Sequence, residues 1–235
     1  MKPRAYVLGW MQPLLAAAPL LPFLSLPWLG VLTIANYYAI FAMSWDILSG
    51  FTRQISLGHA FFVAAAGYTS GLLNLYMKWP VILTIPLGAL AALIVGLWVA
   101  VPALRLRGPY FALVTLVLPL VALKFVIILG PLTGAELGKF GLSPLPLVPI
   151  SPYALNRRMN YYYSLGLLAL ISAPLLMLAF SRFGKIFEAI GESEEVVEAA
   201  GINVAKYKIL AFAISAFVAG LGGAFYVHFW KAVMP

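Results

Sequence analysis

Long apolar runs separated by short polar passages dominate the chain. A helix needs about 20 predominantly apolar residues to cross the hydrocarbon layer of a bilayer. The pattern therefore predicts about seven membrane-spanning helices. Their approximate ranges are 1–27, 28–50, 50–73, 80–102, 110–130, 161–180 and 209–230. The predicted fold is all-α, a polytopic transmembrane helical bundle in which residues 1–235 form one domain.

The first apolar run has two interpretations. Lys2 and Arg4 precede it, as basic residues precede the apolar region of a cleaved signal peptide. However, Pro13, Pro19 and Pro22 interrupt the run, and it lacks a clean small-x-small site before a polar stretch. We favour a first span whose N-terminus is cytoplasmic.

Small residues recur at every fourth position in several of the predicted spans. Glycine and alanine at this spacing let two helix backbones approach closely within a membrane. The pattern therefore predicts tight helix packing at four sets of positions: Ala60/Ala64, Gly67/Gly71, Gly88/Ala92/Gly96 and Ala216/Gly220/Ala224.

The longest polar passage between two strongly apolar runs comprises residues 181–208. Its first part predicts a short amphipathic helix, because four apolar residues fall at i, i+3, i+4 and i+7: Phe183, Ile186, Phe187 and Ile190. We expect Gly191 to end this helix in a left-handed conformation. A second helix follows, with Ser193 as its N-cap and Glu194 and Glu195 in its first turn. Gly201 is expected to end the second helix, and Asn203 supports the turn that follows.

This predicted helical hairpin has two interpretations. It is either a solvated connection that happens to be helical, or a docking surface for a soluble partner. The second interpretation uses the apolar face as an anchor. The passage also holds five of the seven acidic residues of the chain: Glu188, Glu192, Glu194, Glu195 and Glu198.

Composition and charge support a membrane protein. The chain is 63 % hydrophobic and only 9 % charged, with a mean hydropathy of +0.99, whereas soluble domains are about 25 % charged. The net charge of +8 comes from basic residues at the ends of apolar runs, without the interleaved aromatics of a nucleic-acid site. With the N-terminus inside, the positive-inside trend places the hairpin in the cytoplasm. The inner basic residues are then Lys2, Arg4, Arg53, Arg105, Arg107, Arg182, Lys185, Lys206 and Lys208, and the outer ones Lys78, Lys139, Arg157, Arg158 and Lys231.

Three stretches carry a resemblance to a known family: residues 50–60, 104–116 and 199–226. Together they resemble the branched-chain amino acid permeases of ABC importers, of the LivM type. In residues 195–201 the spacing is similar to the Glu-Ala-Ala…Gly signature of ABC-importer coupling loops, with valine in place of both alanines. Arg53 departs from the family, which usually has glycine there, and arginine resists a positive φ. The family continues with further helices, so we expect this chain to stop short of them at Pro235.

The resemblance implies a membrane permease subunit of an ATP-driven importer that translocates branched-chain amino acids across the prokaryotic cytoplasmic (inner) membrane. The implied partners are a second permease subunit, two ABC ATPase subunits and an extracytoplasmic solute-binding protein. Residues 181–208 would be the cytoplasmic coupling loop, with Glu195 and Gly201 setting its geometry. Phe183, Ile186 and Phe187 would form the apolar plug, which is the part of the loop that anchors the ATPase.

We expect the substrate path to follow the third span and the proline-interrupted fifth span. Its candidate residues are Gln54, Ser56, His59, Tyr68 and Pro119. His59 is either a proton-relay or substrate group, or a histidine hydrogen-bonded between helices. Pro119 either opens the helix to a pathway or produces a kink that improves packing.

Two other functions remain open at the sequence level. The first is a urea or short-amide permease of the same family, and the second is a secondary transporter or channel that uses His59 and Lys124 without an ATPase. An enzyme is not predicted, because the chain lacks the Gly-x4-Gly-Lys-Ser/Thr phosphate loop, and ATP hydrolysis is expected on partner subunits. We also predict no cofactor and no metal site, since cysteine is absent and histidine occurs only twice.

Overall fold

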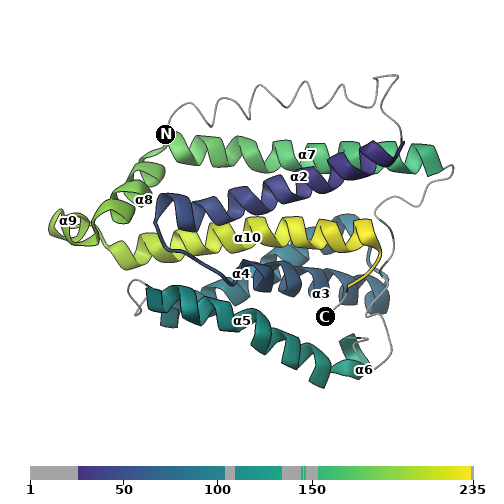
Figure 1. Cartoon of the computed structure of the whole chain (residues 1–235), viewed down its shortest axis with the longest axis horizontal. Coiled ribbons are helices and arrows are strands. Elements are labelled where there is room, and N and C mark those ends of the chain that lie inside the picture. The colour runs from purple at the N-terminus through teal and green to yellow at the C-terminus, as the bar shows by residue number, and fades with distance from the viewer. Residues whose placement is uncertain (1–25, 104–108, 134–143, 145, 147–152, 234–235) are drawn as a thin grey trace.

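The computed structural model describes residues 26–103, 109–133, 144, 146 and 153–233. Every regular element in this part of the chain is a helix, as Figure 1 shows. The helices are α2 (Leu26–Asp46), the π-helical turn η2 (Ile47–Phe51), α3 (His59–Met77), α4 (Val81–Ala103), α5 (Pro109–Ile128), α6 (Gly130–Thr133), α7 (Tyr153–Phe180), α8 (Arg182–Glu192), α9 (Glu194–Ala199) and α10 (Val204–Trp230).

Six helices of the described residues are long and apolar enough to cross a membrane. These are α2 with η2, α3, α4, α5, α7 and α10, and they confirm the predicted all-α polytopic bundle. The predicted first span, at residues 1–27, lies outside the described residues apart from its last two. The other six predicted spans each correspond to one of these helices.

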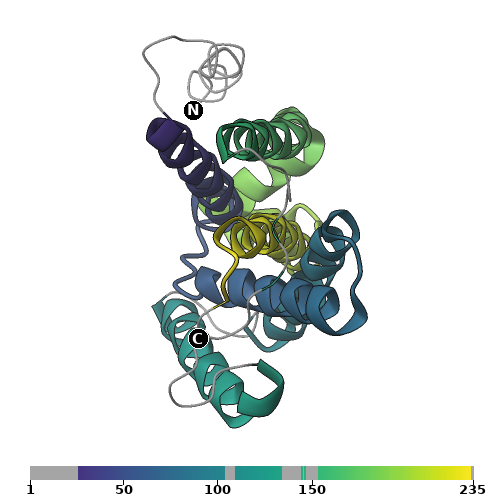
Figure 2. The same ribbon diagram turned by 90° about the vertical axis from the view of Figure 1, so that its right-hand side faces the viewer.

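Helix α10 forms the centre of the bundle. It packs most extensively against α4 and α3 on one side, and against α2 on the other. Helix α2 in turn pairs with α7, so that Figure 2 shows the α2–α7 pair and the α3–α4 pair on opposite sides of α10. This position explains why α10 is the most buried of the six candidate spans.

Small residues produce the close contacts around α10, as their spacing predicts. A Cβ atom added to Gly220 would lie 2.7 Å from the Cβ of Ala92, and one added to Gly96 would lie 2.5 Å from the Cβ of Ala216. Both separations are shorter than normal carbon contacts, so glycine is required at these positions. The four-residue spacing thus predicted close packing at these positions of α4 and α10, and the structure shows that the two faces pack against each other.

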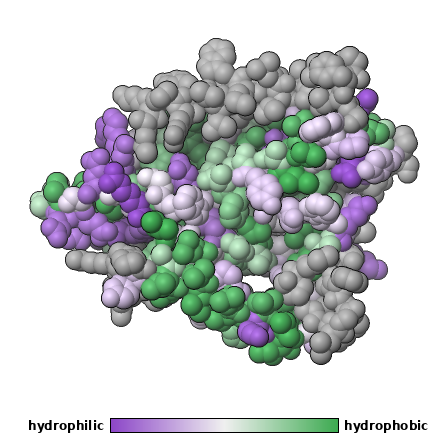
Figure 3. All heavy atoms as spheres, in the orientation of Figure 1, coloured by the Kyte–Doolittle hydropathy of each residue, from purple (hydrophilic) through white to green (hydrophobic). Residues whose placement is uncertain are grey.

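Helix α5 lies at the periphery. In Figure 2 it is separated from the two helix pairs, and among the other spans it has appreciable contact only with α3. Figure 3 shows its hydrophobic side chains along one edge of the molecule, whereas hydrophilic residues gather over α8 and α9. This distribution is consistent with an apolar zone that meets lipid and a polar end that meets water.

The predicted boundary of the sixth span is wrong by two helical turns. We expected a loop as far as Asn160, but α7 begins at Tyr153. Several of its first residues are polar, which hides them from a hydropathy pattern, yet some of their side chains form hydrogen bonds within the helix. Asn160 Nδ2 donates to the backbone oxygen of Asn156 at 2.9 Å and to Asn156 Oδ1 at 2.7 Å.

Candidate functional site

Three side-chain caps organise the hairpin formed by α8 and α9. Ser181 Oγ accepts hydrogen bonds from the backbone amides of Phe183 at 3.1 Å and Gly184, so it begins α8. Ser193 Oγ accepts from the Val196 amide and begins α9, as predicted. Such caps satisfy amide groups that have no partner in the first helical turn. The third cap is Asn203, whose Oδ1 accepts from the Lys206 amide at 3.0 Å at the start of α10.

The two glycines of the hairpin have different roles. Gly201 ends α9, as predicted: its φ is +80°, in the left-handed region, and its amide donates to the oxygen of Glu198 at 2.9 Å. The prediction that Gly191 ends the first helix in a left-handed conformation is wrong, because α8 continues through it to Glu192. A Cβ atom at Gly191 would collide with the backbone oxygen of Phe51. Gly191 therefore permits close contact between α8 and η2 and does not end the helix.

The apolar face of α8 is divided between the protein interior and the surface. Phe187 and Ile190 are 1 % and 2 % exposed, and Phe187 lies against the ring of Tyr207 on α10 at 6.4 Å between centroids. Ile186 is partly buried, whereas Phe183 is 47 % exposed. Most of the face predicted to anchor a partner thus anchors α8 to its own bundle.

The outer surface of the hairpin is acidic. Glu188, Glu192, Glu195 and Glu198 are all exposed. Two valines replace the alanines of the coupling-loop signature after Glu195. Val196 is 68 % exposed, whereas Val197 is 5 % exposed and packs with Ile190 and Val204. The first valine of the signature is therefore a surface residue, and the second belongs to a small core that holds α9 to α8 and α10.

The loop between η2 and α3, residues 52–58, lies within the family-like stretch 50–60 and is called the motif loop below. Arg53 adopts φ +50°, so the backbone takes the left-handed conformation despite the arginine side chain. Trp45 Nε1 donates to the backbone oxygen of Ser56 at 2.8 Å. The Leu57 amide donates to Thr115 Oγ1 at 3.0 Å, and a Cβ atom at Gly58 would collide with the backbone oxygen of Thr115. These contacts attach the start of α5 to the loop.

His59 joins α3 to α10 and α2. Its Nε2 lies 3.0 Å from Ser215 Oγ, and that hydroxyl donates to the backbone oxygen of Ser44 at 2.6 Å. Because the serine proton is used in this way, Nε2 is the protonated nitrogen and Nδ1 carries a lone pair. Nδ1 is buried and has no hydrogen-bond partner in the described structure. This geometry matches the interpretation of a histidine bonded between helices.

The candidate pathway residues do not form one site. Ser56 and His59 are buried near the start of α3, whereas Tyr68 lies nine residues further along this helix in a cluster with Val227 and Val233. Pro119 is inside the peripheral helix α5. Of the five residues, Gln54 borders the cavity between the hairpin and α5. The pathway role of the five residues remains a prediction.

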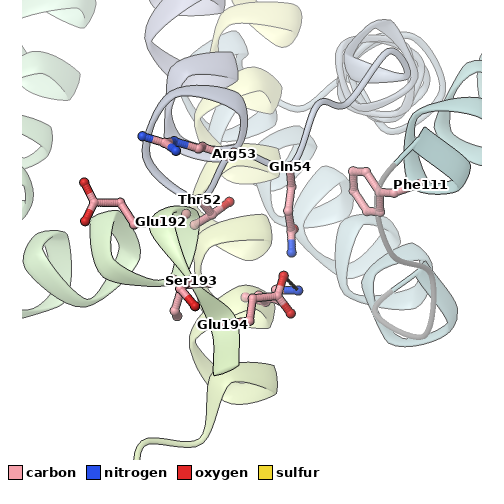
Figure 4. A pocket seen from close by; sticks show the side chains of 10 residues that line it. Thr52, Arg53, Gln54, Phe111, Glu192, Ser193 and Glu194 are labelled. Carbon is pink, nitrogen blue, oxygen red and sulfur yellow. Dashed lines mark hydrogen bonds and ion pairs between the residues drawn. The ribbon is translucent and has the colours of Figure 1, made fainter. Parts of the chain in front are cut away.

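That cavity, of about 300 Å³, lies where the motif loop meets α5, the hairpin and α10. Its walls come from residues 52–54, Phe111, residues 190–194 and Lys208. Figure 4 shows the Gln54 side chain directed into the space between Phe111 and Glu194. Lys208 Nζ pairs with Glu194 Oε1 at 2.5 Å, and the lysine side chain is only 7 % exposed.

The sequence pattern does not single out the Lys208–Glu194 pair. The two residues are 14 positions apart and lie in different helices, so no helical spacing connects them. The available signal was the lysine itself, which stands where the polar passage ends and a long apolar helix has begun. A lysine in such a position commonly has a carboxylate partner.

Comparison with known proteins places these features in a family. Residues 28–235 match the family model described as branched-chain amino acid transport system / permease component. The high-affinity branched-chain amino acid transport system permease protein LivM of Escherichia coli K12 is 27 % identical over 94 % of this chain and 57 % of its own length. The protein of the same name from Salmonella typhimurium LT2 is 26 % identical over 96 % of this chain and 58 % of its own length.

A third relative, the uncharacterized protein MG121 of Mycoplasma genitalium, is 26 % identical over 68 % of this chain and 52 % of its own length. No solved structure matches the chain significantly. The chain spans a little over half the length of the curated relatives it matches. Because the family model covers nearly nine tenths of its residues, the chain belongs to the branched-chain amino acid transport system permease component family.

Proposed function

We propose that this chain is a permease subunit of an ATP-driven importer that translocates branched-chain amino acids across the prokaryotic cytoplasmic membrane. The names of its family and of its relatives support this substrate class. The observation that carries the proposal is the hairpin. It is a charged, water-facing pair of short helices that packs firmly on the end of an otherwise apolar bundle.

The hairpin is built to transmit movement to the membrane helices. Helix α8 follows directly after α7, and α8 contacts η2, α9 and α10. Phe187 belongs to the same core cluster as Phe62 of α3 and Phe212 of α10. A partner that pulls on α8 would therefore move several spans together, as alternating access requires.

The proposed assembly contains a second permease subunit, two ABC ATPase subunits and an extracytoplasmic solute-binding protein. With a cytoplasmic N-terminus, the hairpin lies on the side where an ATPase has access. We assign the contact to the exposed residues Phe183 and Val196 and to the glutamates beside them. Ile186 and Phe187 support this surface from behind, while Glu195 and Gly201 set the geometry of α9.

Transport by the reconstituted assembly tests the proposal. Proteoliposomes that hold all partner subunits should take up labelled leucine only when both ATP and the binding protein are present. Unlabelled isoleucine or valine should compete for uptake, and urea should not. Uptake of labelled urea, with no uptake of leucine, would indicate the short-amide permease. Leucine uptake driven by an ion gradient without the ATPases would contradict an ATP-driven importer.

Two phenylalanines on α8 separate partner contact from internal packing. Phe183→Ala should reduce the stimulation of ATP hydrolysis by loaded binding protein at least fivefold, because an exposed aromatic anchor is lost. The folded yield should stay close to that of the wild type. Phe187→Ala should instead lower the free energy of unfolding by about 3–5 kcal/mol, because it empties a buried site. Normal stimulation by Phe183→Ala would remove this residue from the contact.

A further inference from the structure

The cavity beside the hairpin contains both signs of charge at close range. Lys208 and Glu194 form a partly buried ion pair in its wall, with Nζ and Oε1 2.5 Å apart. Arg53 and Glu192 also border it, and within the described residues neither side chain has a hydrogen bond or an ion pair. The charged lining thus comprises two cations and two anions, which suits a ligand that carries both charges.

Gln54 adds an uncharged polar group to the same wall. Its Oε1 atom is inaccessible to solvent and has no hydrogen-bond partner in the described structure. A buried oxygen without a donor is costly, at about 1–3 kcal/mol, and such atoms are rare in folded proteins. In Figure 4 the amide nitrogen of this side chain points toward Glu194, so Gln54 offers a hydrogen-bond donor on this side of the cavity.

Apolar side chains complete the lining. Phe111 and Ile190 are 5 % and 2 % exposed, and both border the cavity beside the charged groups. The volume of about 300 Å³ is at the lower end of the range for small-molecule sites. A cavity with an apolar wall and paired charges fits a free amino acid with a branched aliphatic side chain.

We propose that this cavity binds a free branched-chain amino acid from the side of the membrane where the hairpin lies, and that the bound amino acid slows the importer. The choice of amino acid and the regulatory effect rest on the proposed function, whereas the binding site rests on the cavity itself. The carboxylate of the ligand pairs with Lys208 and accepts a hydrogen bond from the Gln54 amide nitrogen. Its ammonium group donates to Glu194, and its side chain lies against Phe111 and Ile190.

Such a ligand would hold together elements that transport has to separate. The residues that line the cavity belong to the motif loop, α5, the α8–α9 hairpin and α10. A molecule that contacts all four stabilises the arrangement seen in this structure relative to any arrangement in which the hairpin has moved. Accumulated product would therefore reduce the rate of ATP hydrolysis and transport.

The test uses the complete importer in proteoliposomes whose ATPase side faces the bath, with the binding protein and leucine inside. L-leucine added to the bath should reduce ATP hydrolysis in a concentration-dependent manner. Leucinamide lacks the carboxylate and 4-methylpentanoate lacks the ammonium group. Each should therefore require at least a tenfold higher concentration for the same inhibition.

Variants of two lysines on α10 locate the effect. Lys208→Met should raise the half-inhibitory concentration of L-leucine at least tenfold. Lys206→Met is the matched control, because Lys206 is exposed on the same helix and does not border the cavity. If Lys208→Met fails to fold, the double variant Glu194→Gln/Lys208→Met serves instead, since it leaves neither charge without its partner.

The outcomes distinguish a failure of the proposed binding site from a failure of the proposed function. Loss of inhibition in Lys208→Met, with inhibition retained in Lys206→Met, supports the site. Absence of inhibition, or equal inhibition in both variants, overturns it, while normal ATP-driven release of leucine from the same vesicles into the bath leaves the proposed function intact. If the vesicles release no leucine when ATP is added, equilibrium dialysis of labelled leucine against the purified complex decides. Binding that depends on Lys208 supports the site alone, and the absence of such binding overturns it.

Discussion

Helices α10 and α5 are both long, apolar membrane spans, yet they have opposite environments. Of the most apolar part of α10, 61 % is buried inside the protein, whereas the corresponding value for α5 is 11 %. Helix α5 is nevertheless the more hydrophobic of the two. In a membrane protein, hydrophobicity therefore does not predict which helix lies at the centre, because lipid tails are as apolar as leucine.

The two helices differ in the size and polarity of their residues. Helix α10 presents small residues and a few hydroxyl and imidazole groups to its neighbours, so that close packing and interhelical hydrogen bonds favour its burial. Helix α5 carries mostly leucine, valine and phenylalanine on exposed positions, and a single threonine binds it to the motif loop. Small and polar residues thus identify the central helix better than hydropathy does.

The largest effect is expected from enlarging a small residue of α10. Gly220→Val should nearly abolish the yield of folded protein, because the Cβ atom of the new side chain would lie 2.7 Å from Ala92 Cβ and 2.9 Å from Ala89 Cα. Size-exclusion chromatography of the detergent-solubilised protein measures this yield. Gly166→Val is the control, since nothing lies within 4 Å of that position, and its yield should be unchanged. A normal yield of Gly220→Val would refute the close α4–α10 contact.

A smaller loss is expected from removing a hydroxyl group that joins α10 to its neighbours. Ser215→Ala leaves His59 Nε2 without its acceptor and should lower the free energy of unfolding by about 1 kcal/mol. Thermal unfolding followed by tryptophan fluorescence provides the comparison. Thr69→Ala is the matched control, because that hydroxyl bonds only to Ala65 of its own helix, and it should shift the midpoint less. Equal shifts would mean that the interhelical bond adds no stability.

The smallest effect is expected on α5. Leu120 is 60 % exposed, so Leu120→Ala should change the free energy of unfolding by less than about 0.5 kcal/mol. Leu168 on α7 is 5 % exposed, and Leu168→Ala should cost about 2–5 kcal/mol in the same thermal assay. A large loss from Leu120→Ala would show that this side of α5 packs against protein rather than lipid.

Much of the fold could be predicted from the sequence because its strongest signals are local. Apolar runs determine the spans, and four-residue spacing of small residues determines the contacts of α10. The caps at Ser193 and Gly201 could likewise be predicted from short-range rules. The start of α7 was missed because polar residues that bond within a helix look like a loop in a hydropathy pattern.

The candidate site was less predictable because it depends on contacts between distant segments. Gly191 looks like a helix terminator, but its lack of a side chain is used for contact with Phe51. The periodicity of α8 correctly predicted an apolar face, although it could not show that Phe187 faces the bundle. Arg53 looked incompatible with a positive φ, yet the loop imposes one at a cost of about 1–2 kcal/mol.

The proposed coupling role requires that the α8–α9 hairpin lies on the ATPase side of the membrane and that its outer surface is accessible. The chain has no cysteine, so Val196→Cys introduces a single thiol at a 68 % exposed position. Trp79→Cys, between α3 and α4 and at a 42 % exposed position, gives a matching thiol at the opposite end of these helices. Labelling both variants with a membrane-impermeant maleimide is the most direct test. We predict that intact cells label Trp79→Cys alone, that inverted vesicles label Val196→Cys, and that bound ATPase subunits protect it. Labelling of Val196→Cys in intact cells would contradict the account.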